Sequence, residues 1–105
     1  MSTGWLNREI RSKSDAHVDG GDPILTVVFG ERTEFVYCPT PDEYRITAAV
    51  VQKAKDLGAT IVAYGEGWCG VTEEGREYGK ELNISVMPYR SFFAYLRRYG
   101  VIFTG

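Results

Sequence analysis

The fold is decided by an apolar stretch and the loop after it, Thr60-Ile61-Val62-Ala63-Tyr64 and Gly65-Glu66-Gly67-Trp68-Cys69-Gly70. The first stretch carries no charge and is mostly β-branched or apolar, which predicts a strand covered on both faces. A helical pattern ends at Gly58 before this strand, and a second helix starts at Thr72 after the loop. In open α/β sheets the crevice beyond the carboxyl end of an inner strand is the usual site of function, so the loop is a candidate site.

The composition is that of an ordinary globular protein. The chain of 105 residues suffices for one domain with a single core, and it is 44% apolar and 25% charged. It has no run of about 18 apolar residues and no apolar N-terminal segment of signal-peptide length, so we expect a cytoplasmic protein with no membrane partner. The net charge of −2 gives no global basic footprint for nucleic acid. Two cysteines and one histidine exclude a disulfide scaffold and a His-rich metal site.

Regular elements are predicted on both sides of the apolar strand. In chain order they are an irregular helix and loop over 1–23, strands over 24–29 and 33–38, a helix over 41–57, the strand over 60–64, a helix over 72–82, a strand over 84–87 and a helix capped by Ser91. The short link Gly30-Glu31-Arg32 predicts an antiparallel hairpin, while helices between the later strands require parallel crossovers. The sequence therefore predicts one α/β domain over 1–105, with a mixed sheet and helices on both faces.

The clearest local signal is the run Thr40-Pro41-Asp42-Glu43. Threonine followed three residues later by glutamate forms a capping box, and proline suits the first helical position because its missing N–H is not needed there. Apolar residues then recur on one helical face up to Leu57, and Gly58 supplies the C-terminal left-handed position. This run predicts a helix of about four turns that starts at Pro41.

The order of elements resembles the core of the restriction-endonuclease-like superfamily, in particular Mrr-type domains. In those domains a Gly-Asp-rich loop leads into a hairpin with acidic residues, and a capped helix, an apolar strand, a polar loop and a short helix follow. The matching pieces here are Asp19-Gly20-Gly21-Asp22, Glu34-Phe35-Val36-Tyr37-Cys38, Thr40-Pro41-Asp42-Glu43, Thr60 to Tyr64 and Val71 to Tyr78. The resemblance covers about four fifths of the chain and rests on this pattern.

The resemblance implies a nuclease site with a divalent metal. In such enzymes two carboxylates hold the metal that activates water, and a lysine assists the nucleophile. Asp22 and Glu34 take the carboxylate places, as catalytic and metal-binding residues with Mg²⁺ as the cofactor. The lysine place holds Val36, and in a shifted register Tyr37 and Pro39 fall on the two catalytic places. The resemblance is therefore to a degenerate core, and the missing lysine favours Asp22 as a turn residue and Glu34 as a solvated strand residue.

Arginines and tyrosines are interleaved near the C-terminus, at Arg90, Arg97, Arg98 and Tyr99. Such a mixture can bind a nucleic-acid backbone and stack on bases. The same residues also fit a solvated polar face opposite the apolar stripe of the last helix. Both interpretations stay open at this point.

The loop over 65–70 offers Glu66, Trp68 and Cys69 as candidate ligand-binding or thiol residues. A helix N-terminus favours a thiolate, but the glutamates on either side oppose it, and the second cysteine of a thioredoxin-type motif is missing. The glycines lack the lysine of a Walker loop and the spacing of a dinucleotide fingerprint. The loop is either a small-ligand or thiol site or an ordinary turn with an inert thiol.

These patterns predict a small non-catalytic α/β domain that resembles a degenerate restriction-endonuclease-like core. We expect it to bind a partner protein or nucleic acid, to form a homodimer and to require no cofactor. One alternative is a metal-dependent nuclease that uses Asp22 and Glu34 with Mg²⁺. A further alternative places a small ligand or thiol chemistry in the loop Gly65–Gly70.

Overall fold

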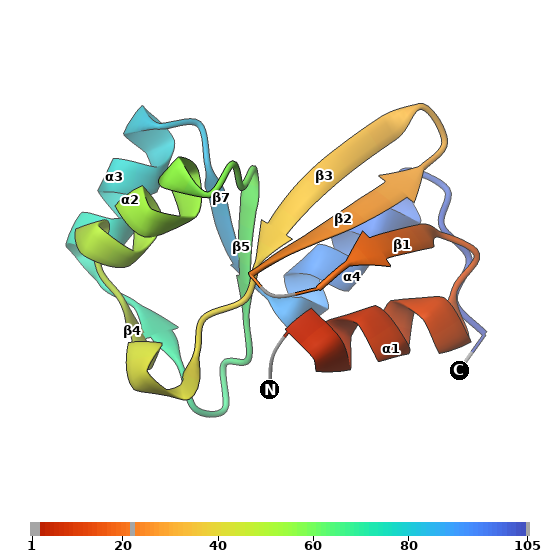
Figure 1. The fold of residues 1–105 in the computed structure, drawn as a ribbon, viewed down its shortest axis with the longest axis horizontal. Coiled ribbons are helices and arrows are strands. Elements are labelled where there is room, and N and C mark those ends of the chain that lie inside the picture. The colour runs from red at the N-terminus through yellow and green to blue at the C-terminus, as the bar shows by residue number, and fades with distance from the viewer. Residues whose placement is uncertain (1–2, 22, 105) are drawn as a thin grey trace.

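Five strands form one mixed sheet in the computed structural model, which describes residues 3–21 and 23–104 (Figure 1). They are β1 (His17–Gly20), β2 (Ile24–Phe29), β3 (Arg32–Tyr37), β5 (Ile61–Tyr64) and β7 (Ser85–Pro88), and they lie in the order β1-β2-β3-β5-β7. The first three pair antiparallel, and β3, β5 and β7 run parallel. The predicted mixed sheet, with an antiparallel hairpin and parallel strands joined through helices, is confirmed.

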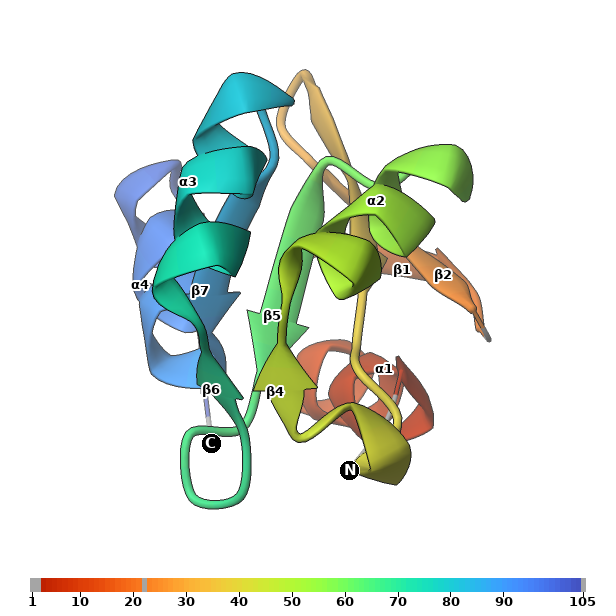
Figure 2. The same cartoon turned by 90° about the vertical axis from the view of Figure 1, so that its left-hand side faces the viewer.

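Helices cover both faces of the sheet (Figure 2). The helices are α1 (Thr3–Lys13), α2 (Ala48–Asp56), α3 (Glu73–Glu81) and α4 (Tyr89–Arg98). One core lies between the sheet and α1 with α4, and the other lies between the sheet and α2 with α3. All four residues of β5 are buried, with Ile61 and Ala63 in the first core and Val62 and Tyr64 in the second. The expected doubly covered strand is therefore confirmed.

The helix expected to start at Pro41 starts at Ala48 instead. Residues Pro41–Glu43 form a single 3-10 turn, and a short strand, β4 (Arg45–Ile46), follows it. This strand pairs parallel with β6 (Gly70–Val71), so Figure 2 shows a second, two-stranded sheet beneath α2 and α3. The prediction was wrong over two turns because pairing with a distant segment holds the chain extended. The N-cap of α2 is Thr47, whose hydroxyl accepts a hydrogen bond from the Val50 N–H at 3.4 Å.

Two further segments differ from the prediction. The polar segment before Ile24 contains β1, an edge strand, although its composition predicts a loop. Helix α4 starts at Tyr89, directly after Pro88, rather than after the expected cap Ser91. The expected left-handed end of α3 is present, because Asn83 has a φ of 58°. None of the helices in the described ranges has the length and hydropathy needed to span a bilayer.

Candidate functional site

Glu34 lies on β3, and its carboxylate faces α4. It accepts a hydrogen bond from the Thr60 hydroxyl at 2.8 Å and another, short, from the Tyr95 hydroxyl. The Thr60 hydroxyl itself accepts from the Phe35 N–H at 2.9 Å, so the carboxylate is tied into the junction between β3 and β5. The carboxylate expected to bind a metal therefore links a strand to a helix.

Asp22, the second expected metal ligand, lies outside the described residues. Ile24, at the start of β2, is paired with Tyr37, whereas Glu34 is opposite Val27. Ile24 and Val27 are three positions apart, which corresponds to about 10 Å along β2. Within residues 3–21 and 23–104 no three His, Cys, Asp or Glu side chains come together as a metal-binding group.

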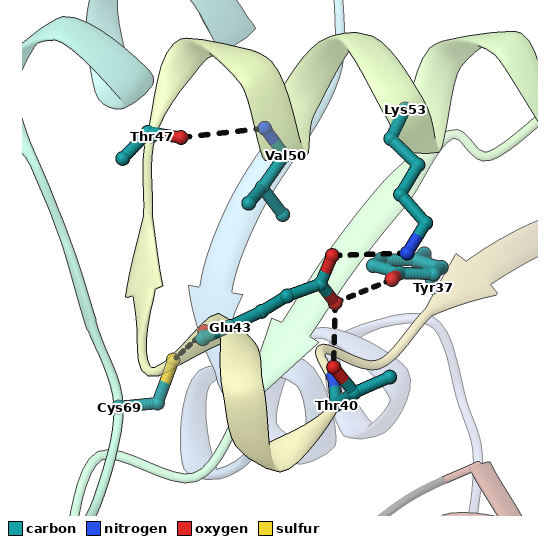
Figure 3. A network of polar contacts seen from close by, with 7 residues as sticks. All are labelled: Tyr37, Thr40, Glu43, Thr47, Val50, Lys53 and Cys69. Carbon is teal, nitrogen blue, oxygen red and sulfur yellow. Dashed lines mark hydrogen bonds and ion pairs between the residues drawn. The ribbon is translucent and has the colours of Figure 1, made fainter.

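A polar network lies where the sequence predicted the start of a helix (Figure 3). The Glu43 carboxylate accepts hydrogen bonds from the Tyr37 hydroxyl at 2.5 Å and from the Thr40 N–H at 2.9 Å. The Lys53 ammonium on α2 completes the set with an ion pair to the same carboxylate at 3.0 Å. Three donors from a strand, a turn and a helix thus meet at one partly buried acceptor. Lys53 was not identified from the sequence, because its contact with Glu43 exists only once α2 packs beside the end of β3.

The electrostatics of this network favour a fixed ion pair. Burial opposes ionisation of Glu43, but hydrogen bonds from Tyr37, Thr40 and Lys53 outweigh it and lower the pKa of the carboxyl. Hydrogen bonds to Tyr37 and Glu43 raise the pKa of Lys53, and burial raises the pKa of Tyr37. At neutral pH Glu43 is therefore charged, Lys53 protonated and Tyr37 neutral. None of the three can accept or release a proton readily, so the network locks the 3-10 turn to the sheet and to α2.

The loop over 65–70 forms a tight turn in which Glu66 and Cys69 have polar partners. Glu66 pairs with Arg90 through two contacts, Nε–Oε1 at 2.5 Å and Nη2–Oε2 at 3.5 Å, so the first arginine of the predicted basic set already has a carboxylate partner. The Cys69 thiol is buried and donates to the Glu43 carbonyl at 3.4 Å. Burial raises the pKa of this thiol, which removes thiolate character at neutral pH. The Trp68 indole Nε1 is buried and has no hydrogen-bond partner within the described ranges.

The other end of α4 carries the exposed aromatic and basic groups. We call Arg32, Tyr95, Arg98 and Tyr99 the Tyr99 surface. The Tyr99 ring packs against Tyr95, with centroids 5.0 Å apart, and against Phe29 at 6.3 Å, yet 45% of Tyr99 is exposed. Arg32, at the hairpin tip, places its guanidinium carbon 4.2 Å from the centre of the Tyr99 ring. The Tyr95 hydroxyl beside it raises the pKa of this guanidinium, so Arg32 is charged at any physiological pH.

The predicted basic set is therefore divided between the two ends of α4. Arg90 lies in the first turn of α4, where it pairs with Glu66 of the loop, whereas Arg97 and Arg98 lie in the last turn. The guanidinium carbon of Arg97 lies 4.7 Å from the centre of the Phe103 ring. The arginine that contacts Tyr99 is Arg32 of the hairpin, which lies outside the basic set predicted from the sequence. The sequence carries no local signal for this contact, because Arg32 and α4 meet only after the hairpin packs onto the helix. Within the described ranges Arg32, Arg97 and Arg98 form no ion pair.

A hollow adjoins the Tyr99 ring. It measures about 320 Å³ and is lined by Asp15, Ala16, His17, Val28, Phe29, Gly30, Tyr99, Gly100 and Val101. One wall is aromatic, through Phe29 and Tyr99, and another is backbone at Gly30 and Gly100. A planar group could enter this hollow and contact the exposed part of the Tyr99 ring.

The chain was compared with protein-family models, with curated proteins and with solved structures, and none of the three comparisons found a match.

Proposed function

We propose that this chain is a non-catalytic domain that binds single-stranded nucleic acid through the Tyr99 surface. The supporting observation is the position of Arg32, whose charge lies over a half-exposed tyrosine ring with no ion-pair partner in the described ranges. Base-stacking aromatic rings beside unneutralised arginines are the elements that sequence-tolerant single-strand binders combine. The occupied Glu34 and the fixed Glu43–Lys53 pair support a role without catalysis.

The geometry suggests how a strand would be held. A base stacks on the exposed Tyr99 ring at the hollow, and Arg32 releases the ring to bind a phosphate with its planar donor group. Arg98, one turn from Tyr95 on the same helix face, extends the cationic track. The chain as a whole has a net charge of −2, so binding depends on this local patch and weakens steeply as salt rises.

The test is fluorescence anisotropy with labelled single-stranded DNA and RNA of about 12 nucleotides. Tyr99→Leu keeps an apolar contact with Phe29 but removes the stacking ring, and Arg32→Ala removes the charge. We expect Tyr99→Leu to weaken binding about 10-fold, because stacking one base contributes roughly 1–3 kcal/mol. Arg32→Ala should weaken binding through loss of a phosphate contact and reduce its dependence on salt. Circular dichroism confirms that each variant is folded.

Two matched controls test whether binding depends on the Tyr99 surface itself or on any exposed arginine or tyrosine. Arg90→Ala removes an arginine of the same helix that already pairs with Glu66, and Tyr44→Ala removes a tyrosine that is 58% exposed elsewhere. Both variants should bind like the unchanged protein. Equal weakening by Arg90→Ala and Arg32→Ala, or no binding even at low salt, would refute the proposal.

The nuclease alternative is tested with the same oligonucleotides. It requires cleavage in Mg²⁺ or Mn²⁺ that disappears in Glu34→Ala, and that result would replace the proposal of a non-catalytic domain. Self-association is an independent expectation, which light scattering over a range of concentrations tests. A strict monomer at high concentration would remove the homodimer and leave nucleic-acid binding unaffected.

A further inference from the structure

The two edges of the main sheet differ in whether side chains bind their outward backbone groups. At the β1 edge, side chains from α1 occupy the outward carbonyl groups. Asn7 donates to the Gly20 carbonyl at 3.2 Å, and Arg11 donates to the Val18 carbonyl at 3.3 Å. Such cover prevents another strand from pairing there.

Among residues 3–21 and 23–104, no side chain donates a hydrogen bond to the outward carbonyl groups of β7 in this way. The Ser85 N–H donates to the Thr60 carbonyl at 3.2 Å, so the backbone groups of Ser85 face β5. Because the direction of these groups alternates along a strand, the N–H and C=O of Val86 face outward. The Ile84 N–H is already bound to the Gly79 carbonyl at 2.8 Å, and Pro88 has no N–H. Val86 therefore carries the donor that this edge presents to a partner.

A hollow of about 590 Å³ lies along this edge, between β7 and α3. It is lined by Arg76, Gly79, Lys80, Asn83, Ile84, Ser85 and Val86. Gly79 lets α3 approach the edge closely, because a Cβ atom there would lie 3.0 Å from the Ile84 carbonyl oxygen and 3.3 Å from Val86 Cγ2. The helix side chains thus stand directly beside the open backbone of Val86.

The charged side chains that line this hollow, Arg76 and Lys80, are both positive. Arg76 and Lys80 are one turn apart on α3, so their Cβ atoms are about 6 Å apart. Arg76 has no ion pair within the described ranges. Lys80 lies 3.6 Å from Glu77, but their side chains are 69% and 63% exposed, so this pair is weak. Both cations are available to an incoming carboxylate.

We propose that the β7 edge binds an extended acidic segment of a partner protein, which adds as a strand beside β7. Its backbone would exchange hydrogen bonds with the N–H and C=O of Val86, as in other cases of strand addition. Its acidic side chains on one face would meet Arg76 and Lys80. This site is separate from the Tyr99 surface and does not depend on nucleic-acid binding.

A second copy of the chain fits this edge less well. Antiparallel pairing of two β7 strands about Val86 would form one continuous sheet and place both α3 helices on the same face. Arg76 and Lys80 would then face the same cations of the second copy, and like charges across an interface are unfavourable. Charge complementarity therefore selects an acidic partner.

The test uses a fluorescein-labelled peptide of alternating glutamate and valine. The comparison probes are a peptide of alternating lysine and valine and a backbone N-methylated form of the acidic peptide. Only the acidic peptide with free N–H groups should bind. The double variant Arg76→Glu, Lys80→Glu should weaken its binding by more than about 10-fold, because the like charges would then oppose each other across the contact. Lys55→Glu, an equivalent charge change at an exposed position of α2, should leave binding unchanged.

Amide NMR distinguishes strand addition from simple charge attraction. With the acidic peptide bound, the Val86 amide should shift and exchange more slowly with solvent, while the Val18 amide at the covered edge stays unchanged. The proposal would be overturned by acidic-peptide binding without protection of Val86, by equal binding of the lysine peptide, or by displacement by millimolar inorganic phosphate. A Val86 shift on raising the protein concentration alone would overturn it in favour of a second copy.

Discussion

The contact between α3 and β4 makes Gly75 the position most sensitive to a single added methyl group. A Cβ atom at Gly75 would lie 2.2 Å from the Ile46 carbonyl oxygen and 3.1 Å from the Ile46 carbonyl carbon. These are backbone atoms, and the same oxygen accepts hydrogen bonds from the Thr72 N–H at 3.1 Å and the Thr72 hydroxyl at 3.3 Å. It therefore cannot move aside without loss of the bonds that join β4 to the start of α3.

The Gly75→Ala variant should accordingly be less stable than the unchanged protein. The steric overlap costs about 1–3 kcal/mol and the weakened hydrogen bonds about 1 kcal/mol. Alanine recovers about 1 kcal/mol, because glycine is a poor helix former. The net loss in the free energy of unfolding is then roughly 2 kcal/mol, a large part of the stability of a small domain.

Urea denaturation followed by circular dichroism measures this loss as a lower midpoint with an unchanged slope. The matched control is Gly79→Ala in the same helix, where the nearest atoms are at 3.0 and 3.3 Å and one of them belongs to a side chain. We expect this control to change stability by less than about 1 kcal/mol, because helix propensity offsets the mild overlap. If Gly75→Ala is as stable as the unchanged protein, the close packing of α3 on β4 is wrong.

Three further predictions follow from local contacts. Thr47→Ala should cost about 1 kcal/mol in a denaturation experiment because it removes the N-cap of α2, while Thr40→Ala, whose side chain caps nothing, should cost a few tenths. Glu43→Ala should cost about 2 kcal/mol at neutral pH, since three donors lose their acceptor. Because the pKa of Glu43 is lowered in the folded protein, its contribution to the free energy of unfolding is fully present above the ordinary value of 4.5 and is lost as pH falls through the folded pKa. At low pH the variant should therefore approach the unchanged protein in stability. Cys69 should react with a thiol reagent only as fast as the protein opens, and rapid labelling of the native protein would contradict its burial.

The sequence by itself determined the elements whose signals are local. The uncharged, β-branched run Thr60–Tyr64 predicts a strand buried on both faces, and β5 is buried at each of its positions. The glycine-containing link after Phe29 predicts the antiparallel hairpin, and Thr72 predicts the start of α3, where it accepts from the Gly75 N–H at 3.0 Å. Each of these signals acts between residues that are close in the chain, so its outcome needs no knowledge of the rest.

Tertiary structure decided the segments in which a local preference competes with a distant partner. The glutamate half of the capping box at Thr40 forms, since Glu43 accepts from the Thr40 N–H, but the helix ends after one turn because Arg45 and Ile46 pair with β6. The contacts of Glu43 with Tyr37 and Lys53 then make that turn a junction between sheet and helix.

The surfaces proposed for binding depend on packing in the same way. Arg32 reaches Tyr99 only because the hairpin lies against α4, and Arg90 is lost to the basic set because Glu66 lies across from it. The open edge at Val86 exists because β7 is the last strand of the sheet, which is a property of strand order. A one-dimensional pattern gives the propensity of each segment, but the partner of each side chain follows from which segments meet in space.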